Sequence, residues 1–177
     1  TGGAGFIGSH FIEEILKDDK TSKIVVLDNL SMGQMGNIPD DDRIEFVKGD
    51  VSDLNVLQNI FKKNEFSYIA LFAAIASVQD SIDDPVRTHR VNFDSTLHLI
   101  EHARKQKKLK RIFFASSAAV YGDNPVLPCV ETAAVNPITP YGVDKYASER
   151  YVLNASKLFN VPSTAFRFFN VYGPRQN

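Results

Sequence analysis

Short apolar runs alternate with longer amphipathic stretches along the chain. The runs are rich in β-branched and aromatic residues, which predicts buried β-strands. The sequence predicts five strands, at 23–28, 44–50, 68–74, 111–116 and 163–169. The run at 68–74 is apolar nearly throughout, as is typical of a parallel strand that is covered on both faces.

The stretches between the runs carry helix signals. After the first few residues of the chain, apolar residues recur at helical spacing. Polar residues that can cap a helix stand at 52–53, directly before Pro85 and directly before Pro140. Helices are therefore predicted at 8–18, from 53 to about 63, from 85 to about 106 and from 140 to about 160. Alternating strands and helices predict a single α/β domain over 1–177, built on a doubly wound parallel sheet with helices on both faces.

Glycines at intervals of three residues, Gly2, Gly5 and Gly8, lead into the first predicted helix. They can allow a tight turn, the approach of backbone N–H groups to a pyrophosphate, and close packing of the helix. The spacing is GxxGxxG rather than GxGxxG, and such turns also occur without a ligand. Asp28 ends the next strand about 20 residues later, where a carboxylate can bind both ribose hydroxyls of an adenosine. No arginine stands beside Asp28, which favours NAD over NADP; a helix cap is the alternative role for this residue.

Tyr141 and Lys145 lie four residues apart on a predicted helix and so share one face. An ammonium near a phenol favours the phenolate, so the spacing predicts a lowered pKa for Tyr141 and proton transfer near neutral pH. Ser116 and Ser117 stand at a strand end, where a hydroxyl can bind a sugar hydroxyl or a nascent ketone. A YxxxK pair alone arises by chance, but the order glycine loop, Asp, Ser, Tyr-x3-Lys is specific jointly.

The composition indicates which classes of binding partner are not expected. A net charge of −1 gives no reason to expect a nucleic acid or an anionic membrane. No apolar run approaches transmembrane length, and no signal-peptide pattern is present. A single cysteine, Cys129, excludes an internal disulfide and fits a reducing, cytoplasmic setting. His98 and His102 have the spacing of a metal pair, but no third ligand is apparent, so no metal is predicted.

Taken in order, the motifs resemble one known family. They are TGGAGFIGSH, LDNLSMG, KGDVSD, LFAAIASV, VNFDSTLHLI, SSAAVYGD, PYGVDKYASE and RFFNVYGPRQN, and they cover essentially the whole chain. The chain resembles the NAD-dependent nucleotide-sugar epimerases and dehydratases, which are extended short-chain dehydrogenases/reductases. It is most similar to the UDP-glucose and UDP-N-acetylglucosamine 4-epimerase group. The resemblance implies a Rossmann domain that binds NAD.

The resemblance also implies a role for each matched position. The pyrophosphate would lie on Gly2, Gly5, Phe6 and Ile7, the adenosine ribose on Asp28, Asn29, Ser31 and Gly33, and the adenine near Asp50 and Val51. The nicotinamide half would be bordered by Phe72, Ala73, Ala74, Asn92, Tyr141, Lys145 and Phe168. Ser117, Tyr141 and Lys145 would be catalytic, and Ser77, Ser117, Tyr141 and Asn170 would contact the substrate.

The implied reaction is epimerisation of a UDP-sugar at C4, through a transient 4-keto sugar and a tightly bound NAD. UDP-glucose and UDP-galactose, or their N-acetyl forms, would be the substrates. Dehydratases of the family carry an acid directly after the Ser/Thr, whereas this chain has Ala118-Ala119, which cannot move a proton. Another nucleotide-sugar dehydratase, decarboxylase or ketoreductase is the alternative. A non-catalytic NAD-binding regulator is a third hypothesis, against which the intact Ser117, Tyr141 and Lys145 set argues.

The resemblance and the sheet order also bear on the extent of the protein. The strand before the glycine loop is central in a doubly wound sheet. The chain begins inside the loop, so we expect a preceding strand of about half a dozen residues outside this sequence. A small substrate-binding domain after residue 177 is expected from the resemblance. So is a homodimer formed through the helices predicted from 85 and from 140.

Overall fold

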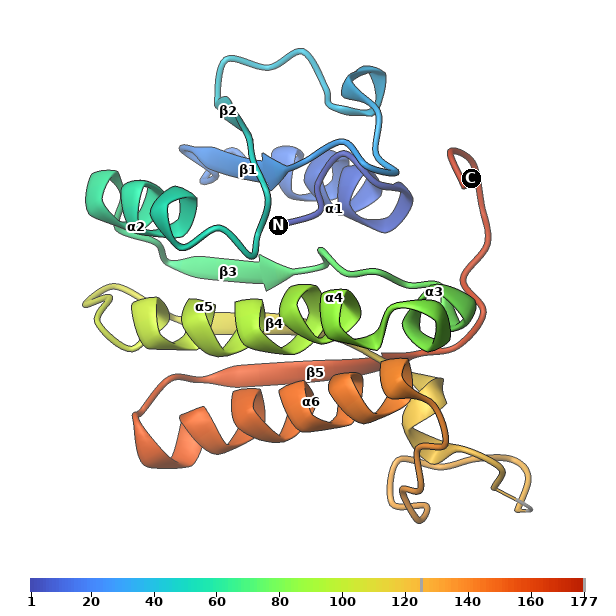
Figure 1. The fold of residues 1–177 in the computed structure, drawn as a ribbon. Coiled ribbons are helices and arrows are strands. Elements are labelled where there is room, and N and C mark those ends of the chain that lie inside the picture. Colours follow the sequence, from blue (N-terminus) through green and yellow to red (C-terminus); the bar gives the residue numbers. More distant parts are fainter. Residues whose placement is uncertain (125, 177) are drawn as a thin grey trace.

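The computed structural model describes residues 1–124 and 126–176, and these contain five parallel β-strands (Figure 1). The strands are β1 (Ile24–Asp28), β2 (Ile44–Lys48), β3 (Tyr68–Leu71), β4 (Arg111–Ser117) and β5 (Ser163–Phe168). β1 pairs with β2, while β3, β4 and β5 form a second sheet in that order. All five strands lie in the predicted runs, with small differences at their ends.

Helices occupy the predicted stretches between the strands. They are α1 (Phe6–Leu16), α2 (Leu54–Lys63), α3 (Val78–Asp83), α4 (Pro85–His89), α5 (Ser95–Ala103) and α6 (Pro140–Leu158). Asp53, Asp84 and Thr139 cap α2, α4 and α6, each accepting a hydrogen bond from a backbone N–H of the first turn. The pattern did not predict α3, which Ser77 caps in the same way.

The predicted long helix from Pro85 is present and runs without a break to Ala103, a few residues short of the predicted end. It is not a regular α-helix throughout, because a single π-helical turn, Arg90–Asp94, lies between α4 and α5. Within this turn the side chain of Asn92 is buried and bonds both backbone groups of Ile75, at 2.8 and 3.0 Å. The π turn therefore lies where the helix meets the loop that follows β3.

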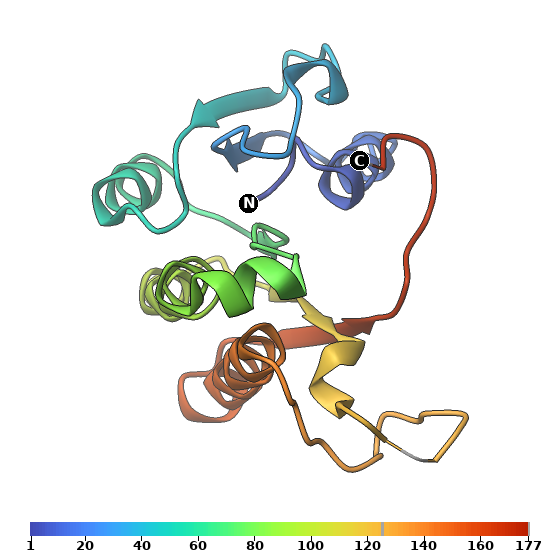
Figure 2. The ribbon, with the colours of Figure 1, turned by 45° about the vertical axis from the view of Figure 1, so that its right-hand side comes forward.

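Helices cover both faces of the sheets. Figure 2 shows α2, α5 and α6 along one side of the strands and α1 on the other. The main core lies between the strands and the first three of these helices, and it contains Leu57, Leu99, Ile100, Ile112, Phe114 and Val152. The predicted α/β fold with helices on both faces is confirmed. No helix within the described ranges is long and apolar enough to cross a membrane.

Thr1 and Gly2 connect the two sheets. The backbone nitrogen of Thr1 donates to the carbonyl of Ala70 at 2.8 Å, and Gly2 N–H donates to the carbonyl of Leu27 at 2.9 Å. The first residues therefore lie between β1 and β3, which brings the glycine loop to the carboxyl ends of both strands. The expected strand before Thr1 and the expected domain after residue 177 stay predictions.

Candidate functional site

The three glycines of the loop meet different surroundings. Gly2 has φ +73°, and a Cβ there would lie 2.6 Å from the backbone nitrogen of Ala73. A Cβ on Gly8 would overlap the carbonyl oxygen of Gly2. A Cβ on Gly5 would lie 3.4 Å from the same oxygen, an ordinary contact. Gly2 and Gly8 are thus required by packing within the loop, whereas the missing side chain of Gly5 leaves open space.

That open space lies at the start of α1. Gly5 is the N-cap residue, and no side chain caps the first turn. The N–H groups at a helix start, together with the helix dipole, stabilise an anion. Phe6 and Ile7 form the beginning of this turn, so the predicted pyrophosphate residues lie together in one cradle that fits a phosphate.

Asp28 joins the glycine loop to the end of β1. Asp28 as a residue is 8% exposed, and its carboxylate accepts hydrogen bonds from Ala4 N–H at 2.9 Å and from Leu30 N–H at 2.8 Å. A carboxylate has about four acceptor positions, so capacity for ribose hydroxyls is left. The structure therefore places Asp28 beside the loop, as predicted, and shows that it also orients the loop backbone.

The other residues predicted around the adenosine gather at the same edge. Asn29 donates to the carboxylate of Asp50 at 2.9 Å and accepts from Ser31 N–H at 2.9 Å. Gly33 lies so close to the loop that a Cβ there would be 2.7 Å from the carbonyl carbon of Ala4. Val51 is buried directly after Asp50. The carboxyl ends of β1 and β2 thus form one polar border next to the cradle.

The residues predicted near the nicotinamide follow β3. Phe72 and Ala73 N–H groups bond Thr1, at 3.2 Å to its carbonyl and 3.3 Å to its hydroxyl. Asn92 borders this region indirectly. Its buried side-chain amide hydrogen-bonds the backbone of Ile75, the residue directly after Ala74. These residues therefore border the glycine loop on the side that faces away from β1.

Ser117, Tyr141 and Lys145 come together between the end of β4 and the start of α6. Burial raises the pKa of the Tyr141 phenol, while a hydrogen bond with Ser117 lowers it, and the result lies above the ordinary value. Lys145 Nζ lies 5.9 Å from the centre of the Tyr141 ring and donates to the carbonyl of Ala115 at 2.8 Å. The prediction that Lys145 lowers the pKa of Tyr141 is wrong for this structure, because the ammonium is turned toward that carbonyl.

Lys145 itself is deeply buried, with 4% of its surface exposed. Burial lowers the pKa of its ammonium to about 8, and the neighbouring Asp144 carboxylate raises it in part. Asp144 is buried too and bonds His89 Nδ1 of α4 at 2.7 Å. A weakly hydrated ammonium close to a phenol is a typical proton-transfer arrangement.

The remaining predicted contacts lie around this group. Ser77 caps α3, and its hydroxyl donates to Asp80 at 2.9 Å. The ring of Phe168 stacks on Phe166, with ring centres 6.0 Å apart, and Asn170 is exposed just after β5. Phe168 is the last residue of β5, and Ser77 and Asn170 follow the carboxyl ends of β3 and β5, where ligands bind in sheets of this kind.

This arrangement agrees with the comparisons to known proteins. A family model described as the NAD dependent epimerase/dehydratase family matches residues 1–177. The chain belongs to this family. A UDP-glucose 4-epimerase of Lacticaseibacillus casei is 36% identical over 172 residues, covering 97% of this chain and 50% of the relative. The chain spans about half the length of the curated relatives it matches.

Solved structures agree with the membership in this epimerase/dehydratase family. UDP-glucose 4-epimerase from Thermotoga maritima, crystallised with UDP-glucose, matches with a TM-score of 0.92 and 35% identity. The UDP-glucose 4-epimerase of Thermus thermophilus, in complex with NAD, matches with a TM-score of 0.90 and 35% identity. Each alignment covers 99% of this chain and 56% of the other. The predicted Rossmann-type fold and the predicted family are confirmed.

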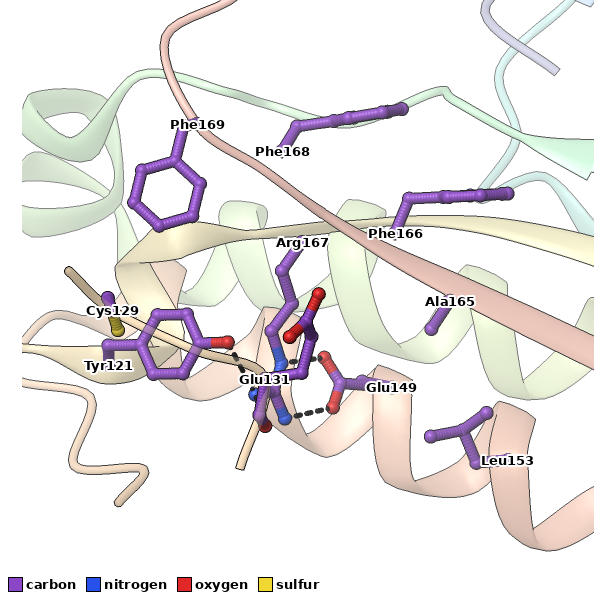
Figure 3. Close-up of a pocket in the computed structure, with 10 residues that line it drawn as sticks. All are labelled: Tyr121, Cys129, Glu131, Glu149, Leu153, Ala165, Phe166, Arg167, Phe168 and Phe169. Atoms are coloured by element: carbon purple, nitrogen blue, oxygen red, sulfur yellow. Dashed lines mark hydrogen bonds and ion pairs between the residues drawn. The ribbon is translucent and has the colours of Figure 1, made fainter. Parts of the chain in front are cut away.

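One group beside this epimerase/dehydratase site escaped the sequence analysis. Glu149 of α6, Arg167 of β5 and Ser116 of β4 are joined by hydrogen bonds through the Glu149 carboxylate, and two of them line a cavity of about 470 Å³ (Figure 3). Two signals could have revealed it. Glu149 stands four residues after Lys145, and Arg167 is a charge inside an apolar strand.

Proposed function

We propose that the full-length protein binds NAD and epimerises a UDP-sugar at C4 through a transient 4-keto sugar. The observation that carries the proposal is the position of the buried Lys145, whose Nζ lies 5.9 Å from the centre of the Tyr141 ring, with Ser117 nearby at the end of β4. This group stands at the same sheet edge as the glycine cradle and Asp28. The similar epimerases, one in complex with NAD and one with UDP-glucose, support it.

The residues present fit NAD. Gly5 leaves space over the start of α1 for a pyrophosphate, and Asp28 presents a carboxylate with spare acceptor capacity. Residues 29–36 contain no lysine or arginine to neutralise a 2′-phosphate, which favours NAD over NADP. Gly2, Phe6 and Ile7 complete the cradle, while Asn29, Ser31 and Gly33 border the ribose position.

NAD supplies the hydride acceptor when it is bound. Tyr141 accepts the proton of the sugar 4-hydroxyl and returns it after the sugar has turned over. Ser117 lowers the pKa of that phenol and orients the reacting hydroxyl, and Lys145 places a positive charge near it. Phe168, Ser77 and Asn170 border the space for the sugar nucleotide.

The residues after Ser117 favour epimerisation over dehydration. Elimination of water needs an additional acid and base, and positions 118 and 119 are alanines in a short 3-10 turn. The N–H of Ala119 is bonded to the Ser117 hydroxyl at 3.1 Å, so this turn orients Ser117. A dehydratase, decarboxylase or ketoreductase is the second candidate.

An assay of the full-length protein tests the proposal. We expect interconversion of UDP-glucose and UDP-galactose, or of the N-acetyl pair, without net NADH release. Tyr141→Phe should reduce kcat by about 100-fold or more, whereas Tyr68→Phe, at an exposed tyrosine, should leave it unchanged. Failure to epimerise any UDP-hexose, or full activity of Tyr141→Phe, would exclude the proposed reaction. Net NADH release or loss of water would favour the second candidate.

The proposal includes a homodimer and a cytoplasmic setting. The dimer would form through α4, α5 and α6, whose outer faces carry exposed apolar side chains such as Val86 and Tyr151. The single cysteine of the sequence, Cys129, fits a reducing compartment.

A further inference from the structure

Three consecutive residues at the end of β4 each act on a different residue of α6. The carbonyl of Ala115 accepts from Lys145 Nζ at 2.8 Å, and the side chain of Ser117 lowers the pKa of the Tyr141 phenol. Between them, the hydroxyl of Ser116 donates to Glu149 Oε2 at 2.6 Å. The outer two contacts hold the proposed catalytic groups, and the middle one touches neither.

The middle contact is a rigid, buried structure. Glu149 is 2% exposed, and Arg167 donates to both of its carboxylate oxygens, from Nε at 3.0 Å and from Nη2 at 2.6 Å. Such bidentate pairs fix orientation as well as charge. Arg167 is the direct neighbour of Ser116 across the β4–β5 pairing. Strand and helix are thus tied at one point by three side chains, of which Figure 3 shows Glu149 and Arg167.

Arg167 is also held from its other side. Its Nη1 donates to the hydroxyl of Tyr121 at 2.9 Å and to the carbonyl of Glu131 at 3.0 Å. All three guanidinium nitrogens therefore have acceptors within the protein, which leaves the group poorly suited to bind an anionic ligand. Its role is to hold Glu149.

We propose that Glu149, held by Arg167, is a positioning residue that fixes Ser116 and thereby aligns the Ala115 carbonyl with Lys145 and the Ser117 hydroxyl with Tyr141. The proposal rests on the proposed function, in which Tyr141 moves the proton. Small displacements of a reacting group reduce rates strongly, so a loosened strand end lowers turnover without removing any catalytic group.

The ionised state of Glu149 suits this role. Burial raises its pKa, but hydrogen bonds from Arg167 and Ser116 lower it by more, so the pKa lies below the ordinary value. A carboxylate is a pure acceptor, so the Ser116 hydroxyl must donate to it, and the direction of that hydroxyl is fixed.

Ser116→Ala in the full-length protein tests the proposal with little risk to folding, because the Glu149–Arg167 pair stays intact. The matched control is Ser95→Ala, which also removes a buried serine hydroxyl, one that bonds the carbonyl of Val91 within the helix. We expect Ser116→Ala to lower kcat by about 10-fold to 100-fold, with KM for the UDP-sugar within about twofold of the wild-type value. Glu149→Gln should act in the same direction, and Ser95→Ala should do neither.

A second measurement does not depend on activity. Tyrosinate absorbance, taken as the difference from a matched Tyr141→Phe protein, follows the titration of the Tyr141 phenol. We expect Ser116→Ala to move this titration to higher pH, because the Ser117 hydrogen bond that lowers the pKa becomes weaker.

The outcomes separate this proposal from the proposed function. If Ser116→Ala changes thermal stability alone, with kcat and the phenol titration as in wild type, the network is purely structural and the positioning role is excluded. If the wild-type protein epimerises no UDP-hexose but the titration still shifts, the proposed reaction fails and the positioning role stands.

Discussion

Lys145 places an ammonium group where little water reaches it. Removing a charge from water is unfavourable, and one carbonyl bond to Ala115 offsets the loss only in part. The pKa of the Lys145 ammonium is therefore lowered to about 8, because burial disfavours its charged form. Under the proposed function, the charge of Lys145 serves the chemistry at the expense of stability.

Lys145→Met should raise the stability of the folded protein at pH 7 while it abolishes the proposed epimerase activity. The folded-state pKa of Lys145 is depressed, so between about pH 8 and the ordinary value of 10.5 the unfolded chain binds more protons than the folded one. Wild-type stability therefore increases with pH across this window. Denaturant unfolding should show the variant more stable by about 1–3 kcal/mol at pH 7, with the difference shrinking toward pH 10.

The control for this prediction is Lys157→Met, which removes an exposed lysine from the same helix. It should change stability by less than about 0.5 kcal/mol at either pH. A Lys145→Met protein that is less stable than wild type at pH 7 would mean that the ammonium contributes net stability through its carbonyl bond.

The glycine loop and α1 act as one element, in which each glycine has different surroundings and therefore tolerates a side chain to a different degree. Gly8 is crowded by the loop itself, while Gly5 faces open space and Gly36 has no atom within 4 Å of an added Cβ. Substitution by alanine therefore separates folding from ligand binding at positions of the same residue type.

Gly8→Ala should lower the free energy of unfolding by about 2 kcal/mol or more, because its Cβ overlaps the loop backbone. Gly5→Ala should leave stability within about 0.5 kcal/mol of wild type but weaken NAD binding about 10-fold or more, since the methyl enters the phosphate cradle. Gly36→Ala should change neither. Thermal unfolding and calorimetric NAD titration measure the two effects. If Gly5→Ala binds NAD as tightly as wild type does, the pyrophosphate does not bind at this loop.

Elements set by local signals could be predicted from the sequence. The β-branched runs and the caps at Asp53, Asp84 and Thr139 depend on neighbouring residues only, and the structure keeps them. The π turn could not be predicted, because Asn92 makes its bonds to Ile75, 17 positions away.

The candidate site could be predicted only in part for the same reason: contacts between distant residues are not visible in local spacing. Helical spacing placed Tyr141 and Lys145 together correctly. It did not show that Lys145 turns to Ala115, 30 positions away, or that Glu149 pairs with Arg167, 18 positions away. Contacts between distant segments, and the burial that shifts each pKa, arise only when strand and helix are packed.

At the scale of the whole molecule, α4 and α6 present an apolar outer surface. Val86 is 70% exposed and Tyr151 50% exposed, and a cleft of about 720 Å³ lies between these helices, lined by Val86, Ile138 and Val143 among others. Exposed apolar groups that cluster on one face are typical of an interaction surface. This face is the one assigned to the homodimer in the proposed function.

Val86→Glu should convert the proposed dimer into monomers, because it buries a charge without a partner at the interface. Val126→Glu, at a similarly exposed valine in the loop before α6, should leave the assembly unchanged. Sedimentation velocity of the full-length protein distinguishes the two. A wild-type protein that sediments as a monomer, or a Val86→Glu protein that stays dimeric, would contradict the assignment of this face.

The π turn at Arg90–Asp94 also constrains how the sequence can change in length. Its hydrogen bonds span one residue more than those of an α-helical turn, so the helix holds one extra residue at this point. Deleting one residue within the turn would therefore leave a regular α-helix with Leu99 and Ile100 still directed at the core they now fill. A deletion elsewhere between Pro85 and Ala103 would instead rotate everything after it by about 100°. A change of length by one residue is therefore easiest to accommodate at the π turn.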